Sequence, residues 1–155
     1  MHIRVGILIG SPSDKPIAEK ISSTLESLGI GSEVKVLSAH RTPDRVVAYI
    51  TKAEAAGVQV FIACAGMAAH LAGVVAAHTL CPVIGVPVAS GVLAGVDALL
   101  ATVQMPPGIP VATVAIDGGR NAGVLAARIL ALHDPAIKKA LADSLAADQA
   151  RYDLP

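Results

Sequence analysis

The sequence predicts an α/β fold, a doubly wound parallel sheet in a single domain of residues 1–155, and two observations support this. Short runs that are apolar at every position alternate with longer segments whose apolar residues recur every three or four positions. The short runs are typical of strands buried on both faces, and the longer segments are typical of amphipathic helices. Strands that alternate with helices form right-handed crossovers, which place helices on both faces of one sheet.

Five short apolar runs predict the strands of the sheet. The second run is weaker than the others, and together they occupy residues 3–9, 33–37, 58–64, 83–88 and 111–116. Ligands of such sheets bind beyond the carboxyl ends of the strands. The residues that directly follow each run are therefore the first place to look for chemistry.

The segments between the runs predict helices. Residues 16–28 carry apolar side chains at spacings of three and four, and Gly29 ends that pattern. A second helix starts at residues 42–44, where Thr42 is an N-cap, a proline takes the first helical position and an aspartate lies at the positive end of the helix dipole. Further helices are expected at 70–78, 95–103 and 121–132, and a C-terminal helix at 136–152.

Composition limits the classes of function. The chain is 54% apolar but only 2% aromatic, so its core must consist of small aliphatic side chains. Only 15% of the residues are charged, which indicates surface hidden in a homo-oligomer. The 12 basic and 12 acidic residues balance, and no basic stripe or aromatic platform is present for a nucleic-acid polymer.

Membrane, metal and disulfide sites are not expected. The first apolar run is too short to span a membrane and has no cleavage site, so the protein is expected in the cytoplasm. Cys64 and Cys81 lie far apart in apolar runs and are expected to be buried free thiols. His70 and His78 are eight positions apart, not the four that a metal pair on one helix needs.

Residues 10–14, Gly-Ser-Pro-Ser-Asp, follow the first strand. A glycine and two hydroxyls before a helix form a plausible phosphate cradle. The alternative is that Ser13 or Asp14 only caps the helix. The loop matches neither the Walker nor the dinucleotide-binding glycine pattern, so neither ATP nor a dinucleotide is indicated.

Residues 38–41, Ser-Ala-His-Arg, follow the second strand. The Arg41 guanidinium can hold a phosphate through two parallel hydrogen bonds, and the His40 imidazole can move a proton within the same bound molecule. The alternative is a solvated histidine beside a solvated arginine. The expected position at the sheet edge beside Ser11 favours a functional pair.

Residues 65–73 follow the third strand and are small, apolar and glycine-rich. Such a segment lets backbone amides approach a ligand, or lets two elements pack closely. His70 in this segment either faces the ligand or caps the next helix.

Four motifs together resemble one family. They are Gly-Ser-x-Ser-Asp at 10–14, Ser-Ala-His-Arg-Thr-Pro at 38–43, Ala-Ala-His-Leu at 68–71 and Gln-Met-Pro with Gly-Ile-Pro at 104–110. The combination resembles the catalytic subunit of phosphoribosylaminoimidazole carboxylase, whose bacterial form is N5-carboxyaminoimidazole ribonucleotide mutase of de novo purine synthesis. The resemblance implies a flavodoxin-like three-layer sandwich, a homo-octamer and no metal or organic cofactor.

The resemblance also implies roles for individual residues. His40 is the general acid/base, and Ser38 lies near the migrating carboxylate. The remaining roles are substrate binding: the phosphate by Ser11 and Arg41, the ribose by Asp14, and the imidazole and its carboxylate by Gly66, Ala68, His70 and Leu71.

The implied reaction moves a carboxylate from the exocyclic nitrogen of an aminoimidazole ribonucleotide to a ring carbon. One alternative is a carboxylase that adds free carbon dioxide to the same nucleotide. Another is a flavodoxin-like nucleotide-binding module, which the scarcity of aromatic residues disfavours. Met67 stands where the family usually has glycine, Ala72 where it has proline, and Arg41 rather than lysine follows His40, as in the mutase branch.

Overall fold

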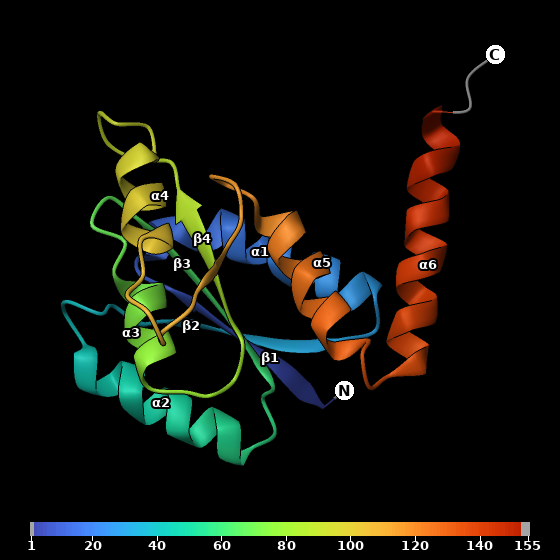
Figure 1. Cartoon of the computed structure of the whole chain (residues 1–155), viewed down its shortest axis with the longest axis horizontal. Coiled ribbons are helices and arrows are strands. Elements are labelled where there is room, and N and C mark those ends of the chain that lie inside the picture. Colours follow the sequence, from blue (N-terminus) through green and yellow to red (C-terminus); the bar gives the residue numbers. More distant parts are fainter. Residues whose placement is uncertain (1, 153–155) are drawn as a thin grey trace.

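A computed structural model of the chain describes residues 2–152. It contains a five-stranded parallel sheet in the order β2-β1-β3-β4-β5, with helices on both faces (Figure 1). The predicted α/β fold is therefore confirmed. The strands are β1 (Ile3–Ile9), β2 (Gly31–Val36), β3 (Val60–Gly66), β4 (Val83–Val88) and β5 (Ala112–Thr113).

Two hydrophobic cores lie on opposite faces of the sheet. Helices α1 (Lys15–Ser27) and α5 (Gly119–Leu130) cover one core, and α2 (Pro43–Ala55) and α3 (Leu71–Ala77) cover the other. Helix α4 (Val96–Val103) packs on β4 beside α3, and α6 (Pro135–Gln149) lies outside α5. The short 3-10 turns are η1 (Pro12–Asp14) and η2 (Ala150–Tyr152).

The central strands bury alternate side chains in the two cores. Ile7 and Ile9 of β1 belong to the core under α1, whereas Leu8 between them belongs to the core under α2. Phe61 of β3 lies on the α2 side and Ile62 on the α1 side in the same way. Because both faces are covered, every position must be apolar, which explains the continuous apolar runs.

The fifth strand is shorter than the sequence predicts. Residues 111–116 were expected to be extended, but only Ala112 and Thr113 pair with β4. Beyond them, the Val114 amide still donates to the carbonyl of Gly85, and the next bond to β4 is from the Asp117 amide to the carbonyl of Pro87. Pro87 has no N–H to offer at that place, so the ladder cannot continue along β4.

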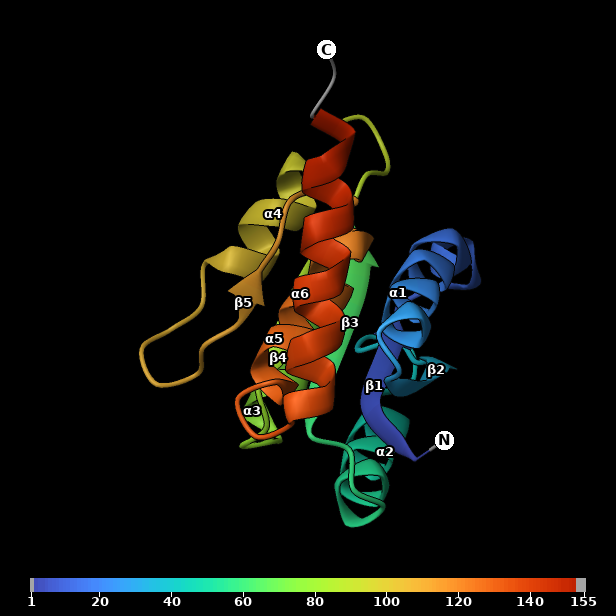
Figure 2. The same ribbon diagram turned by 90° about the vertical axis from the view of Figure 1, so that its right-hand side faces the viewer.

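The C-terminal helix α6 is joined to the domain by polar contacts near its two ends. Asp134 caps it by accepting from the amides of Ala136 and Ile137, and Arg4 of β1 lies 2.6 Å from the same carboxylate. Near the other end, Arg120 of α5 pairs with Asp148 at 2.5 Å. The helix runs alongside α5 at the edge of the domain (Figure 2).

Two further observations concern the thiols and the membrane. Cys64 is buried as expected, and burial raises the pKa of its thiol. Cys81, also expected to be buried, is only half-buried, because it lies before β4 between the exposed residues Leu80 and Pro82. Within residues 2–152 no helix has the length and apolar character needed to cross a membrane.

We expect Asp134→Ala to lower the unfolding temperature by several degrees at pH 7, because the variant loses both the helix cap and the ion pair. Hydrogen bonding to Arg4 lowers the pKa of Asp134 below its ordinary value of 3.8. The carboxylate therefore stabilises the fold fully above that value, and this contribution is lost as the pH falls through the lower folded pKa.

Thermal unfolding followed by circular dichroism between pH 7 and pH 2.5 measures this difference. Asp143→Ala is the matched control, because Asp143 lies on the same helix in an exposed pair with Lys139. A difference between wild type and Asp134→Ala that persists unchanged at the acid end would contradict the assignment.

Candidate active site

The loops that follow the first four strands surround one cavity of about 450 Å³ at the carboxyl edge of the sheet. All the residues predicted for the site line this cavity, except His70. The lining residues are Gly10, Ser11, Ser13, Asp14, Ser38, Ala39, His40, Arg41, Ala65, Gly66, Met67, Ala68, Leu71 and Ser90.

His70 lies next to the cavity and is joined to His40. The Nε2 atom of His40 and the Nδ1 atom of His70 are 2.8 Å apart, and the two rings meet edge to face at 89°. A hydrogen bond between two ring nitrogens needs one N–H donor and one bare acceptor, so this contact cannot form when both rings carry two protons. His40 therefore has a proton partner within the protein.

His70 takes the N-cap position of α3, but its side chain makes no capping hydrogen bond. The ring is directed to His40 instead. Of the two roles left open for His70, the structure thus favours the one at the cavity.

The loop that carries His40 and Arg41 is closed by Ser38 and Thr42. The Ser38 amide donates to Thr42 Oγ1, the Arg41 amide donates to Ser38 Oγ, and the Thr42 amide donates to the Ser38 carbonyl. Thr42 was expected to cap α2, and this expectation is wrong for its side chain, which forms no cap bond. The hydroxyl instead braces the turn and holds His40 and Arg41 at its tip.

The Ser11 loop is a capping box around the turn η1. Ser11 Oγ accepts from the Ser13 amide, and the Asp14 carboxylate accepts from the Ser11 amide at 3.1 Å and from the Ser13 hydroxyl. Asp14 is 7% exposed, and burial raises the pKa of its carboxyl, although these hydrogen bonds oppose the rise. This capping box belongs to η1, whereas the side chain of Asp14, the N-cap residue of α1, forms no capping bond on that helix, and both Ser13 and Asp14 line the cavity.

Arg41 supplies the positive charge of the cavity. Its side chain is exposed, and within residues 2–152 no carboxylate forms an ion pair with it. The neighbouring anion is Asp14, whose hydrogen bonds are made within its own loop. The guanidinium can therefore receive an anionic ligand without breaking a bond within the protein.

The loop between β3 and α3 faces the cavity with its backbone. Gly66 ends β3, and a side-chain carbon there would overlap the hydroxyl oxygen of Ser90. The Ala69 amide donates to the Met67 carbonyl and the His70 amide to the Ala68 carbonyl, both at 2.8 Å, so the chain turns tightly into α3.

Comparisons with known proteins identify the family of the chain. The family model of AIR carboxylase matches residues 4–151. The chain belongs to the AIR carboxylase family.

Relatives within and beyond the bacteria share about half of the sequence. N5-carboxyaminoimidazole ribonucleotide mutase of Pyrococcus abyssi is 54% identical over 138 residues, which cover 89% of this chain and 79% of the relative. The mutase of Methanocaldococcus jannaschii is 56% identical over 135 residues, covering 87% and 83%. The crystal structure of Treponema denticola PurE superposes with a TM-score of 0.89 at 34% identity, covering 96% of this chain and 92% of that one.

Ser90 was missed by the reasoning from sequence. It lies just beyond β4 and lines the cavity, and its hydroxyl lies against Gly66. The available signal was the pair Ser90 and Gly91 directly after the fourth apolar run, at the same edge as the other three loops. Loops after four strands therefore line the cavity of this AIR carboxylase family member, whereas the sequence predicted loops after three.

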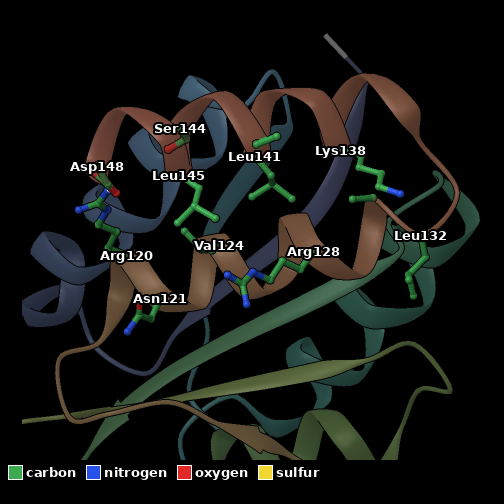
Figure 3. A pocket seen from close by; sticks show the side chains of 12 residues that line it. Arg120, Asn121, Val124, Arg128, Leu132, Lys138, Leu141, Ser144, Leu145 and Asp148 are labelled. Carbon is green, nitrogen blue, oxygen red and sulfur yellow. The ribbon is translucent and has the colours of Figure 1, made fainter. Parts of the chain in front are cut away.

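A second groove, of about 590 Å³, lies between α5 and α6 (Figure 3). Its floor is apolar, with Val124, Leu141 and Leu145, and its charged rim includes the paired Arg120 and Asp148. None of the residues predicted for the site lies in it, and it is formed by helices rather than by strand ends. Within residues 2–152 no group of three metal-ligating side chains is present in this groove or elsewhere.

Met67 has a positive φ of 54° and is 58% exposed. This is the left-handed region, where glycine costs nothing and other residues are strained. We therefore expect Met67→Gly to change the free energy of unfolding by less than about 1 kcal/mol, because relief of strain offsets the greater freedom of the unfolded chain.

We expect Met67→Val to destabilise the protein by about 1–2 kcal/mol, since a branched Cβ is least tolerated at positive φ. Urea unfolding of the two variants and wild type measures the difference. Equal stability of the valine and methionine proteins would refute this account of the turn.

Proposed function

We propose that this chain is an N5-carboxyaminoimidazole ribonucleotide mutase of de novo purine biosynthesis. It is an isomerase that converts N5-carboxyaminoimidazole ribonucleotide to 4-carboxy-5-aminoimidazole ribonucleotide. The observation that carries the proposal is the turn that presents His40 and Arg41 together at the cavity. Relatives that are 53–54% identical over 88–89% of this chain bear the same name.

The phosphate and ribose of the nucleotide bind at the β1 and β2 end of the cavity. Arg41 and Ser11 bind the phosphate, and the Asp14 carboxylate accepts hydrogen bonds from the ribose hydroxyls. The Arg41 guanidinium, which pairs with no carboxylate among residues 2–152, supports the first assignment, and a buried anion held in place by its own loop supports the second.

The imidazole lies toward the loop that follows β3, near Gly66, Ala68, His70 and Leu71, with Ser38 close to the migrating carboxylate. The side chains there are small and apolar, and Ala65 and Leu71 leave little polar surface for water. Such a cavity retains carbon dioxide beside the ring and excludes water.

His40 transfers protons in both halves of the reaction. The bond from the exocyclic nitrogen to the carboxylate breaks and releases carbon dioxide, and the nitrogen keeps the electron pair and takes a proton from His40. The ring carbon then attacks the carbon dioxide, and the proton on that carbon returns to His40. No proton is gained or lost overall, and the scheme needs no metal or organic cofactor.

The proposal also includes the domain organisation of the chain, its oligomeric assembly and its location in the cell. The chain acts as one domain, in the cytoplasm, and as a homo-oligomer, with the octamer that the family resemblance implies. Exposed apolar side chains support association: Val96, Leu100 and Val103 form a stripe along one face of α4.

A direct test compares two substrates with purified protein. We expect product to form rapidly from N5-carboxyaminoimidazole ribonucleotide, and slowly or not at all from 5-aminoimidazole ribonucleotide with bicarbonate. The names of the relatives do not favour the carboxylase that uses free carbon dioxide. Efficient turnover of the second mixture alone would establish that carboxylase and reject the mutase.

We expect His40→Asn to fold and assemble normally and to lower kcat at least about 100-fold, because the amide cannot carry the proton. His133→Asn, at an exposed position outside the cavity, is the control. Steady-state kinetics and thermal unfolding of both variants measure the effect. Near-normal turnover by His40→Asn would disprove the acid/base assignment.

We expect Arg41→Ala to raise KM by roughly 10- to 100-fold with a smaller change in kcat, since a charged hydrogen bond to the phosphate is lost. Arg45→Ala removes an exposed cation one turn further along α2 and should leave KM unchanged. The phosphate assignment fails if the two variants show the same KM.

A further inference from the structure

The hydroxyl of Ser90 is buried at the cavity without a hydrogen-bond partner. Its Oγ atom has almost no exposed surface, and no residue among 2–152 donates to it or accepts from it. Most buried hydroxyls are paired, and one left unpaired costs free energy. Because Ser90 lines the cavity, a bound ligand is the group that can satisfy it.

The missing side chain at Gly66 leaves the space that this hydroxyl occupies. A Cβ on Gly66 would overlap Ser90 Oγ and lie 3.3 Å from Ser90 Cβ. The hydroxyl therefore rests directly against the backbone at the end of β3, and it can do so only because residue 66 has no side chain.

The order of the strands places Ser90 far from the phosphate end. Arg41 follows β2 at one edge of the sheet, and Ser90 follows β4, beyond β1 and β3. A nucleotide whose phosphate lies at Arg41 therefore directs its ring toward Gly66 and Ser90. Most of the surroundings there are apolar, with Ala65 and Leu71 nearby, so an anionic group at this end needs a donor.

We propose that Ser90 binds the carboxylate of the aminoimidazole ribonucleotide by donating a hydrogen bond from Oγ. This inference rests on the proposed function and adds a positioning residue at the end of the cavity opposite Arg41. Ser90 holds the carboxylate once it is on the ring carbon, whereas Ser38 lies near it before it leaves the exocyclic nitrogen, and proton transfer belongs to His40.

The test compares Ser90→Ala with Ser23→Ala, a control at an exposed serine whose hydroxyl donates only to the Lys20 carbonyl of its own helix. Loss of one hydrogen bond to a charged group should lower kcat/KM by about 10- to 100-fold in Ser90→Ala. Ser23→Ala should match the wild type.

Calorimetry with two ligands locates the hydrogen bond. Ser90→Ala should bind 4-carboxy-5-aminoimidazole ribonucleotide about 10-fold or more weakly than wild type. Binding of 5-aminoimidazole ribonucleotide, which lacks the carboxylate, should not change. An equal loss for both ligands, or no loss for either, overturns the assignment to the carboxylate.

Thermal unfolding of the ligand-free variants separates binding from structure. Removing an unpaired hydroxyl should leave Ser90→Ala as stable as wild type or more stable. A marked loss of stability would show that the hydroxyl has a partner in the protein, and would overturn the inference.

Failure of the proposed function would give different activity and binding results from failure of the Ser90 assignment alone. If wild type neither converts nor binds the carboxylated nucleotide, both proposals fall. If wild type is active and Ser90→Ala is equally active, the mutase stands and only the role of Ser90 is rejected.

Discussion

Burial of both faces of the sheet is the constraint on which the rest of the structure depends. Ile7 and Leu8 point into opposite cores, so each central strand needs a helix above and below it. Only crossover connections supply those helices, and they make all the strands parallel. Parallel strands end at one edge, which brings loops distant in sequence around one cavity. The position of the site thus follows from how the apolar surface is buried.

The loops at that edge are stabilised by local hydrogen bonds, since they contribute little to the cores. Ser38 and Thr42 close one turn, and Ser11 and Asp14 close another. The third loop is shaped instead by the absence of a side chain at Gly66, which lets a residue from the neighbouring strand end reach the cavity. The polar side chains of Ser11, Asp14, Ser38 and Thr42 are therefore held in place before a ligand arrives, which lowers the ordering entropy that binding must overcome.

Periodicity within the chain predicted the fold class and two strands, 3–9 and 83–88, to the residue. The failures involve hydrogen-bond partners that hydrophobic periodicity does not specify. The fifth strand is short because Pro87 on its neighbour has no N–H, and Thr42 turns away from its helix toward Ser38. Loop chemistry predicted most of the cavity lining, but the contact of His70 with His40 spans 30 positions and leaves no local pattern. Ser90 differs, because it lies just beyond a predicted strand and could have been found there.

The pair of histidines bears on how an isomerase conserves its proton. In the proposed reaction His40 donates a proton to the exocyclic nitrogen and later takes one from the ring carbon, so it ends each turnover in the state in which it began. Without substrate, Nε2 of His40 is paired with Nδ1 of His70, and only one N–H lies between the two nitrogens. A substrate that reaches Nε2 must take the place of His70, whose ring then stands beside the same cavity. His40 therefore has a proton partner within the protein before the substrate binds, and both rings are exposed at the cavity, where the substrate can reach them.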